Sequence, residues 1–342
     1  MFSSVPKREY AVRNINLSLG HMPPISALPS SSLPIALSSS IAMDNDTNDD
    51  YGVILLVGRS ASGKSTLLRL LAGMEHPIDG SVGINGQWLD DTNGNALGAG
   101  GTMPGIQSWA KMGVPPKPPS DISDEEYFRA QPVILQAKPE FDDSLSVSDR
   151  IFRVGLDTIQ SCHKGWERAG EKKNTSQSKG DERTRNLLRI LAGDFASLLT
   201  LSEEQCRSPP SELSPSGEYL FGIACGCMMS VVPSIAAAFR GDAIKNYDDT
   251  MIDNGSYDQI IMTDDDGMHY PILLLDELFD AEHSSIVEKC GEGMANLIRA
   301  GAVVISATHR PGYFDGIASR TITLSGGKIL MDEKKALPAR YR

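Results

Sequence analysis

One stretch decides the fold that we expect of this sequence, Gly58-Arg59-Ser60-Ala61-Ser62-Gly63-Lys64-Ser65-Thr66. It fits the pattern G-x-x-x-x-G-K-[ST], in which the backbone N–H groups of a glycine-bounded turn surround a polyphosphate. The apolar run 53–57 before it predicts a buried parallel strand, and the leucine-rich segment 67–71 after it predicts a helix that ends at Gly73. A strand, a tight turn and a helix N-terminus in this order direct N–H groups and the helix dipole towards an anion.

Two side chains of this loop have predicted roles. We expect the Lys64 ammonium to contact the β- and γ-phosphates of a nucleotide, and the Ser65 hydroxyl to ligate Mg²⁺. The alternative is a chance turn rich in glycine and serine, which the flanking strand and helix patterns disfavour. The sequence therefore predicts a nucleotide-binding site made by residues 58–66.

The net charge and the cysteines indicate which binding partners and which cellular compartment to expect. The formal net charge of −12 disfavours sequence-independent binding to nucleic acid, because contacts to its phosphates need basic side chains. No nucleic-acid partner is therefore expected. The five cysteines are scattered and lack a C-x-x-C pair, which predicts reduced thiols in a cytosolic protein rather than a zinc site. The first residues show no apolar signal-peptide core, and we therefore expect a cytoplasmic location.

The uncharged stretch from Tyr219 to Phe239 is as long as a membrane span. Its glycines, its serines and Pro233 lower its hydrophobicity, and no basic flank marks an inner end. We therefore expect a helix that is buried in the core of a soluble protein.

Two further strands are predicted to end in polar side chains. The run 271–275 is followed by Asp276-Glu277, and the run 302–307 is followed by Thr308-His309. Adjacent carboxylates after a buried strand suit phosphoryl transfer to water, with Asp276 in the Mg²⁺ shell and Glu277 orienting and deprotonating the attacking water. Alone, the carboxylate pair would be an ordinary loop start; together with the phosphate loop it predicts a Walker B element. A lone histidine at a strand end is more often structural than catalytic.

Four segments of low complexity interrupt the pattern, near residues 20–50, 91–120, 161–185 and 242–266. They are rich in glycine, proline, serine or charged residues, and we interpret them as insertions without a core of their own. The aspartates at 264–266 suit a divalent ion, but a solvated charge run is the favoured interpretation. The remaining pattern predicts one α/β domain over 1–342, with a mostly parallel sheet, an antiparallel β edge and a helical subdomain at approximately 137–239.

The order of these motifs resembles the nucleotide-binding domain of ATP-binding-cassette (ABC) proteins. A phosphate loop, a strand that ends in Gln136, a carboxylate pair and a strand that ends before His309 follow one another. The resemblance implies an ABC-type P-loop NTPase fold that binds ATP and Mg²⁺. It implies that Gln136 contacts Mg²⁺ together with Ser65 and Asp276 and senses a transmembrane partner. It also implies that His309 touches the γ-phosphate and acts with Glu277 in catalysis.

The family's signature motif appears in altered form at 213–218, as Leu-Ser-Pro-Ser-Gly-Glu. Ser214 suits a helix N-cap, and Pro215 suits the first helical position. In the family this motif closes the ATP site of the opposite subunit, so Ser214, Ser216 and Gly217 are implied to contact that nucleotide. The register stays open, because either serine matches the phosphate-binding position.

Two other positions leave alternatives open. The segment 278–283 departs from the family's D-loop, which puts signalling between subunits through this segment in question. Tyr10 is either the aromatic residue that stacks on adenine or an ordinary edge-strand tyrosine.

The motifs and the resemblance together predict ATP binding and hydrolysis by two subunits, in a homodimer or a heterodimer, that enclose two nucleotides. We expect the ATPase subunit of a transporter whose transmembrane part is a separate polypeptide, placed in the cytoplasm or at the cytoplasmic face of a membrane. One alternative is a soluble ABC ATPase without a role in transport. Another is a degenerate ATP-binding regulatory module with little turnover.

Overall fold

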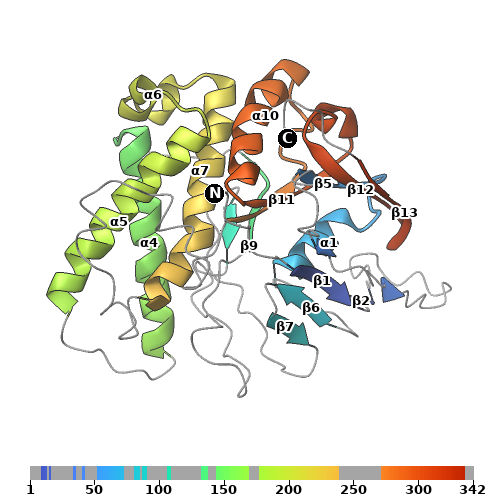
Figure 1. The fold of residues 1–342 in the computed structure, drawn as a ribbon, viewed down its shortest axis with the longest axis horizontal. Coiled ribbons are helices and arrows are strands. Elements are labelled where there is room, and N and C mark those ends of the chain that lie inside the picture. The colour runs from blue at the N-terminus through green and yellow to red at the C-terminus, as the bar shows by residue number, and fades with distance from the viewer. Residues whose placement is uncertain are drawn as a thin grey trace, which may run out of the picture. The chain divides into compact units, whose positions relative to one another are not determined.

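The computed structural model describes residues 9–13, 15–16, 34–35, 41–42, 52–72, 81–84, 87–90, 106–108, 132–137, 144–168, 177–238 and 271–335. The chain divides into two compact units, whose elements are labelled in Figure 1. The first unit spans 1–97, 274–282 and 304–342, and the second spans 98–273 and 283–303. The predicted insertion at 242–266 and the predicted helix end at Gly73 lie outside the described residues.

A mixed sheet with the strand order β13-β12-β5-β11-β10 forms the centre of the first unit. β5 pairs in parallel with β11 on one side and with β12 on the other, whereas β13 pairs antiparallel with β12. Every residue of β10 and of β11 is buried, as expected of apolar strands covered on both faces. The bounds are β5 (Val53–Val57), β10 (Ile272–Asp276), β11 (Val303–Thr308), β12 (Ala318–Ser325) and β13 (Lys328–Lys334).

The register of this sheet brings the predicted motifs to one edge. Val57, the last residue of β5, lies opposite Thr308, the last residue of β11. The backbone N–H of Glu277, directly after β10, donates to the carbonyl of Ala307 at 2.9 Å. The segments that follow these strands therefore start side by side, because the carboxyl ends of parallel strands share one edge of a sheet.

The predicted antiparallel edge is confirmed by a small sheet with the order β4-β1-β6-β7. β2 and β3 form a further antiparallel pair. The interpretation of 20–50 as unstructured is wrong at two points, because β3 and β4 fall within it and pair with strands outside it. The bounds are β1 (Glu9–Arg13), β2 (Ile15–Asn16), β3 (Pro34–Ile35), β4 (Ile41–Ala42), β6 (Ser81–Ile84) and β7 (Gln87–Asp90).

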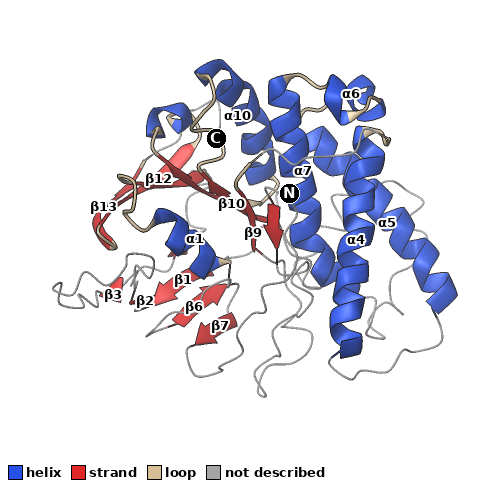
Figure 2. Cartoon of the chain, turned by 180° about the vertical axis from the view of Figure 1, so that it is seen from behind, coloured by secondary structure: helices blue, strands red, loops and turns tan. Residues whose placement is uncertain are grey.

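The second unit is mostly helical, as Figure 2 shows. Helix α7 packs against α4, α5 and α10, and α4 packs against α5. Strand β8 pairs antiparallel with β9, so the interpretation of 91–120 as unstructured is wrong at 106–108. The bounds are α4 (Val147–Arg168), α5 (Gln177–Leu198), α6 (Glu203–Arg207), η2 (Pro210–Glu212), α7 (Pro215–Ala238), α10 (Ser284–Arg299), β8 (Ile106–Ser108) and β9 (Pro132–Leu135).

Helix α7 contains the long uncharged stretch, and residues 219–233 of it are buried within the chain. A Cβ atom at Gly226 would lie 3.2 Å from the Leu135 side chain, so the helix lies close to β9. The buried Ser230 hydroxyl accepts a hydrogen bond from the backbone N–H of Ile272 at 2.9 Å, so this buried hydroxyl has a hydrogen-bond partner. The prediction of a buried core helix is confirmed. Within the described ranges, no helix has the length and apolar character that crossing a bilayer requires.

The predicted linker at 161–185 is helical over most of its length. Helix α4 continues to Arg168, and α5 already begins at Gln177, ten residues before the apolar pattern starts at Leu187. The prediction was wrong because a helix that is held by its apolar face extends at little cost through lysine, glutamate, arginine and glutamine, which all favour helix. Such extensions carry no apolar periodicity in the sequence.

The buried guanidinium of Arg320 on β12 has its partner on β13. Its Nε and Nη2 atoms donate to Oδ1 and Oδ2 of Asp332 at 2.7 and 2.6 Å. This hydrogen bonding from Arg320 holds the pKa of Asp332 below its usual value. The bidentate geometry fixes the register of the edge strand.

We expect Asp332→Asn to lower the free energy of unfolding by about 1–2 kcal/mol at neutral pH, because a buried guanidinium loses its charged partner. The native pair stabilises the fold above the unfolded-state pKa of Asp332, and this stabilisation is lost as the pH falls through the depressed folded-state pKa. The difference between parent and variant, measured by urea unfolding, should therefore shrink in acid. The matched control is Asp315→Asn, which breaks an exposed pair with Lys335 and should change stability by less than about 0.5 kcal/mol. Equal stability of Asp332→Asn and parent at neutral pH would contradict this account.

Candidate functional site

The predicted phosphate loop connects the end of β5 to the start of α1 (Lys64–Leu71). A Cβ atom at Gly58 would lie only 2.4 Å from the carbonyl oxygen of Leu324, so this position cannot carry a side chain without a shift of the backbone. Gly63 has a φ of 102°, which residues with a side chain rarely adopt. The geometry of the loop therefore requires both glycines of the motif.

The loop also contains a residue with a side chain in the left-handed region. Ala61 has a φ of 61°, a conformation that costs a residue with a Cβ atom about 1–2 kcal/mol. Such strained positions are concentrated at ligand-binding and catalytic sites, where the surrounding structure holds them in place. The loop is thus held in a fixed shape before any ligand contacts it.

The Lys64 ammonium lies inside the loop, and the side chain is only 3% exposed. Its Nζ donates to the carbonyl oxygen of Gly58 at 3.0 Å and reaches that of Arg59 at 3.4 Å. The same atom lies 3.5 Å from Oε1 of Glu277 and 3.3 Å from Nε2 of His309. A buried cation therefore lies between the loop and the two residues that the sequence predicts to be catalytic.

Ser65 and Asp276 are joined by a direct contact, in which the Ser65 hydroxyl donates to Oδ1 of Asp276 at 2.8 Å. Ser65 lies in the first turn of α1 and Asp276 ends β10, so two separate elements bring these oxygens together. A hydroxyl and a carboxylate beside a phosphate-binding loop are oxygen ligands of the kind that Mg²⁺ prefers. The donor set fits the predicted ion.

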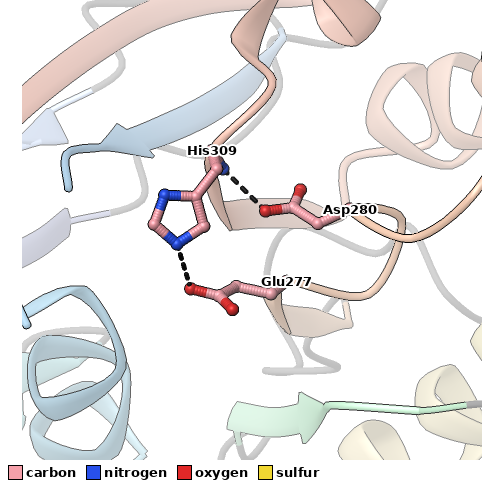
Figure 3. A group of neighbouring side chains, drawn as sticks. All are labelled: Glu277, Asp280 and His309. Carbon is pink, nitrogen blue, oxygen red and sulfur yellow. Dashed lines mark hydrogen bonds and ion pairs between the residues drawn. The ribbon is translucent and has the colours of Figure 1, made fainter. Parts of the chain in front are cut away.

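Glu277 contacts His309 directly, as Figure 3 shows, with Oε1 2.9 Å from the histidine Nε2. The two side chains are 42% and 36% exposed, which leaves them accessible to water. Glu277 has a φ of 56°, so the backbone turns sharply where the strand ends. A half-exposed carboxylate beside an imidazole and a buried ammonium is suited to accept a proton from water.

Asp280 is a member of this site that the sequence analysis did not single out. Its Oδ2 accepts a hydrogen bond from the backbone N–H of His309 at 2.7 Å (Figure 3), and its Oδ1 accepts one from the Thr308 hydroxyl. Carboxylate oxygens of Glu277 and Asp280 and a ring nitrogen of His309 lie within 4.8 Å of one another. The sequence analysis noted only the segment 278–283, which contains Asp280, as a departure from the D-loop pattern, and assigned Asp280 no role.

The comparison with known families agrees with this geometry. The family model described as "ABC transporter" matches residues 49–215, which include the phosphate loop and Gln136. The predicted resemblance to the ABC family is confirmed over these residues. The matched residues end within the altered signature motif, at Pro215.

Curated relatives match this chain over short stretches. The lipoprotein-releasing system ATP-binding protein LolD of Psychrobacter arcticus is 50% identical over 65 residues, which are 19% of this chain and 29% of that protein. The Fe(3+) ions import ATP-binding protein FbpC of Pseudomonas fluorescens is 54% identical over 39 residues, which are 11% of each chain. The matched region spans less than a third of the length of these relatives.

A solved structure resembles nearly the whole chain. The ADP conformation of MJ1267, an ATP-binding cassette of an ABC transporter, matches with a TM-score of 0.51 and 13% identity over 97% of this chain and 92% of that one. At this identity the likeness shows the fold. The predicted fold class, an ABC-type α/β P-loop domain with an antiparallel edge and a helical part, is confirmed.

Gln136 and the residues of the altered signature motif lie in the second unit. Gln136 follows directly after β9 and is half-buried. At the start of α7, the backbone N–H of Gly217 donates to the Ser214 hydroxyl at 3.2 Å, as expected of an N-cap. Ser216 is buried, whereas Ser214 is exposed. The roles of these residues towards a nucleotide stay predictions, and the side chain of Tyr10 lies outside the described residues.

Proposed function

We propose that this chain binds and hydrolyses ATP at the loop 58–66, as the ATPase subunit of an ABC transporter. The observation that carries the proposal is the convergence of three functional groups in the first unit. The Lys64 ammonium, the Glu277 carboxylate and the His309 imidazole lie within 3.5 Å of one another, at the ends of three strands. A buried cation for phosphate oxygens next to a carboxylate that water can reach is the arrangement that phosphoryl transfer to water needs.

The proposed reaction assigns one task to each group. Glu277 removes a proton from a water molecule while the water oxygen forms a bond to the γ-phosphorus. The bond from the γ-phosphorus to the bridging oxygen breaks, and ADP leaves with the electron pair of that bond. Lys64 and His309 contact the γ-phosphate oxygens and stabilise the charge that they carry.

Mg²⁺ is the proposed ion of this site, held by Ser65 and Asp276 together with the phosphates, and Gln136 stays a predicted ligand. The contact between the Ser65 hydroxyl and the Asp276 carboxylate supports this assignment, because both oxygens already face one another. The bound ion would neutralise charge on the β- and γ-phosphates.

We further propose that two chains enclose two nucleotides, with the start of α7 from one subunit completing the site of the other. The curated relatives are named as ATP-binding proteins of a lipoprotein-releasing system and of Fe(3+) import, which supports a role in transport. We therefore place the chain in the cytoplasm, at the face of a membrane that holds a separate transmembrane partner. Because Ser214 is exposed and Ser216 is buried, Ser214 is the better candidate for contact with another subunit.

Replacing both Ser214 and Ser216 by alanine tests this assembly. Each hydrogen bond to a charged phosphate is worth about 1.5–3 kcal/mol, and every 1.4 kcal/mol is a factor of ten. We therefore expect ATP hydrolysis and ATP-driven association, measured by light scattering, to fall together by at least about tenfold. The ATP affinity of the single subunit, which depends on Lys64 and its loop, should stay unchanged.

The matched control for this experiment is Ser202→Ala, which removes the capping serine of α6 in the same unit. It should leave hydrolysis and association at the parent level. If the double variant associates and hydrolyses like the parent, the start of α7 is not a signature motif. ATP binding without turnover at any chain concentration would instead favour a regulatory module.

A further inference from the structure

The loop that carries His309 is tied to the segment after Glu277 by one carboxylate. Asp280 accepts the backbone N–H of His309 with Oδ2 at 2.7 Å and the Thr308 hydroxyl with Oδ1. The Thr308 oxygen in turn accepts the backbone N–H of Arg310 at 2.9 Å. Both oxygens of the carboxylate therefore accept hydrogen bonds, and the donors are two successive residues of the same loop.

A second link joins the same two segments. The carbonyl oxygen of Glu282 accepts hydrogen bonds from the Tyr313 hydroxyl at 3.2 Å and from Nη1 of Arg310 at 3.4 Å. Arg310 and Tyr313 also contact each other at 2.6 Å, with the guanidinium over the ring. These contacts are made by residues that follow His309, whereas Asp280 bonds to the backbone of His309 itself.

We propose that Asp280 is a positioning residue, which holds His309 so that its imidazole meets Glu277. Asp280 contacts the backbone of His309, whereas the ring Nε2 of His309 lies 2.9 Å from Oε1 of Glu277. The carboxylate therefore acts on the imidazole through the peptide that carries it. In Figure 3 it lies on the backbone side of His309, while Glu277 lies on the ring side.

A carboxylate suits this task because of the donors that it meets. The backbone N–H of His309 and the hydroxyl of Thr308 both donate, and a carboxylate accepts both at once with its two oxygens. Hydrogen bonds to an ionised acceptor are shorter and stronger than bonds between neutral groups, and they restrict the orientation of the peptide. A displacement of a catalytic side chain by about 1 Å can reduce a rate about a hundredfold.

The proposal rests on the proposed function, and its first test uses turnover. Asp280→Ala should lower kcat for ATP hydrolysis about 10- to 100-fold and leave KM within about twofold, because Asp280 bonds to the Thr308 hydroxyl and the His309 backbone rather than to the phosphate loop. Asp280→Asn keeps one acceptor oxygen and should recover most of this loss. The matched control is Asp315→Asn, an exposed aspartate beside the same loop whose partner is Lys335, and it should hydrolyse ATP like the parent.

A double-mutant cycle separates positioning from a general effect on the fold. If Asp280 acts through His309, Asp280→Ala should cause no further loss of kcat in a chain that already carries His309→Ala. Losses that multiply in the double variant would overturn the proposal. Thermal unfolding of each variant shows whether the fold is retained.

A second measurement decides the matter without turnover, and so distinguishes a failure of this proposal from a failure of the proposed ATPase activity. The chain has six histidines, and the imidazole ¹⁵N signals of His309 can be assigned by their disappearance in His309→Ala. In the nucleotide-free chain, Asp280→Ala should shift these signals towards those of Glu277→Ala, in which the ring has lost its partner. Asp280→Asn should leave them near the parent positions, which excludes a mere effect of charge. Unchanged imidazole signals in Asp280→Ala would overturn the proposal even if ATP were hydrolysed. Shifted signals in a chain that hydrolyses no ATP would retain the positioning role and reject the ATPase.

Discussion

A chain that carries Glu277→Gln is expected to bind ATP as tightly as the parent and to hydrolyse it more slowly by about two to four orders of magnitude. The reason is chemical, because an amide in the place of the carboxylate cannot accept the proton of the attacking water. The position of the side chain should be retained, since the backbone N–H of Glu277 stays bound to the Ala307 carbonyl. Phosphate release under saturating ATP and binding by calorimetry measure the two effects separately.

The matched control for Glu277→Gln is Glu288→Gln, which removes an exposed carboxylate from α10. This control should hydrolyse ATP at the parent rate. A Glu277→Gln variant that turns over at the parent rate would show that Glu277 is not the base. A variant that no longer binds ATP would show that the carboxylate is needed to shape the loop, through its contact with Lys64.

Lys64→Ala is expected to abolish nucleotide binding. Its ammonium is the buried cation of the loop, and charge-assisted hydrogen bonds to phosphate are about twice as strong as neutral ones. The loss of this charge also leaves the carbonyl oxygen of Gly58 without its bond to the ammonium. Calorimetric titration with ATP, combined with thermal unfolding to confirm the fold, measures the effect.

Lys335→Ala is the control for the change of net charge, because Lys335 pairs with Asp315 at the surface. Its affinity for ATP should equal that of the parent. If a folded Lys64→Ala chain binds ATP with unchanged affinity, residues 58–66 do not form the nucleotide site.

The part of the fold that the sequence predicts well is the part that is set by local apolar runs. β5 consists only of Val, Ile and Leu, β10 of Ile and Leu up to its last residue Asp276, and β11 begins with three such residues before Ser306. Parallel pairing brings these ends together, whereas the place of His309 in the same site was implied only by the resemblance to the ABC family. Helix α7 could be predicted for a similar reason, since residues 219–238 carry no charged side chain on any side of the helix.

The part that the sequence predicts poorly depends on contacts between distant residues. The strands at 34–35 and 41–42 are too short to show a pattern, and they form because β1 and β2 supply partners. The ends of α4 and α5 extend through polar residues that have no apolar period. The role of Asp280 follows from the backbone N–H of His309, which no sequence pattern records. The positive φ angles of Ala61 and Glu277 likewise follow from the turns that surround them.

The central claim is that this chain hydrolyses ATP with Glu277 as the base, in a site completed by a second subunit. Phosphate release from ATP, measured across chain concentrations that span association, tests it most directly. The account predicts that turnover per chain rises with chain concentration and that Glu277→Gln binds ATP but releases phosphate about two to four orders of magnitude more slowly. Bound ATP that stays intact in the parent chain at every concentration would contradict it.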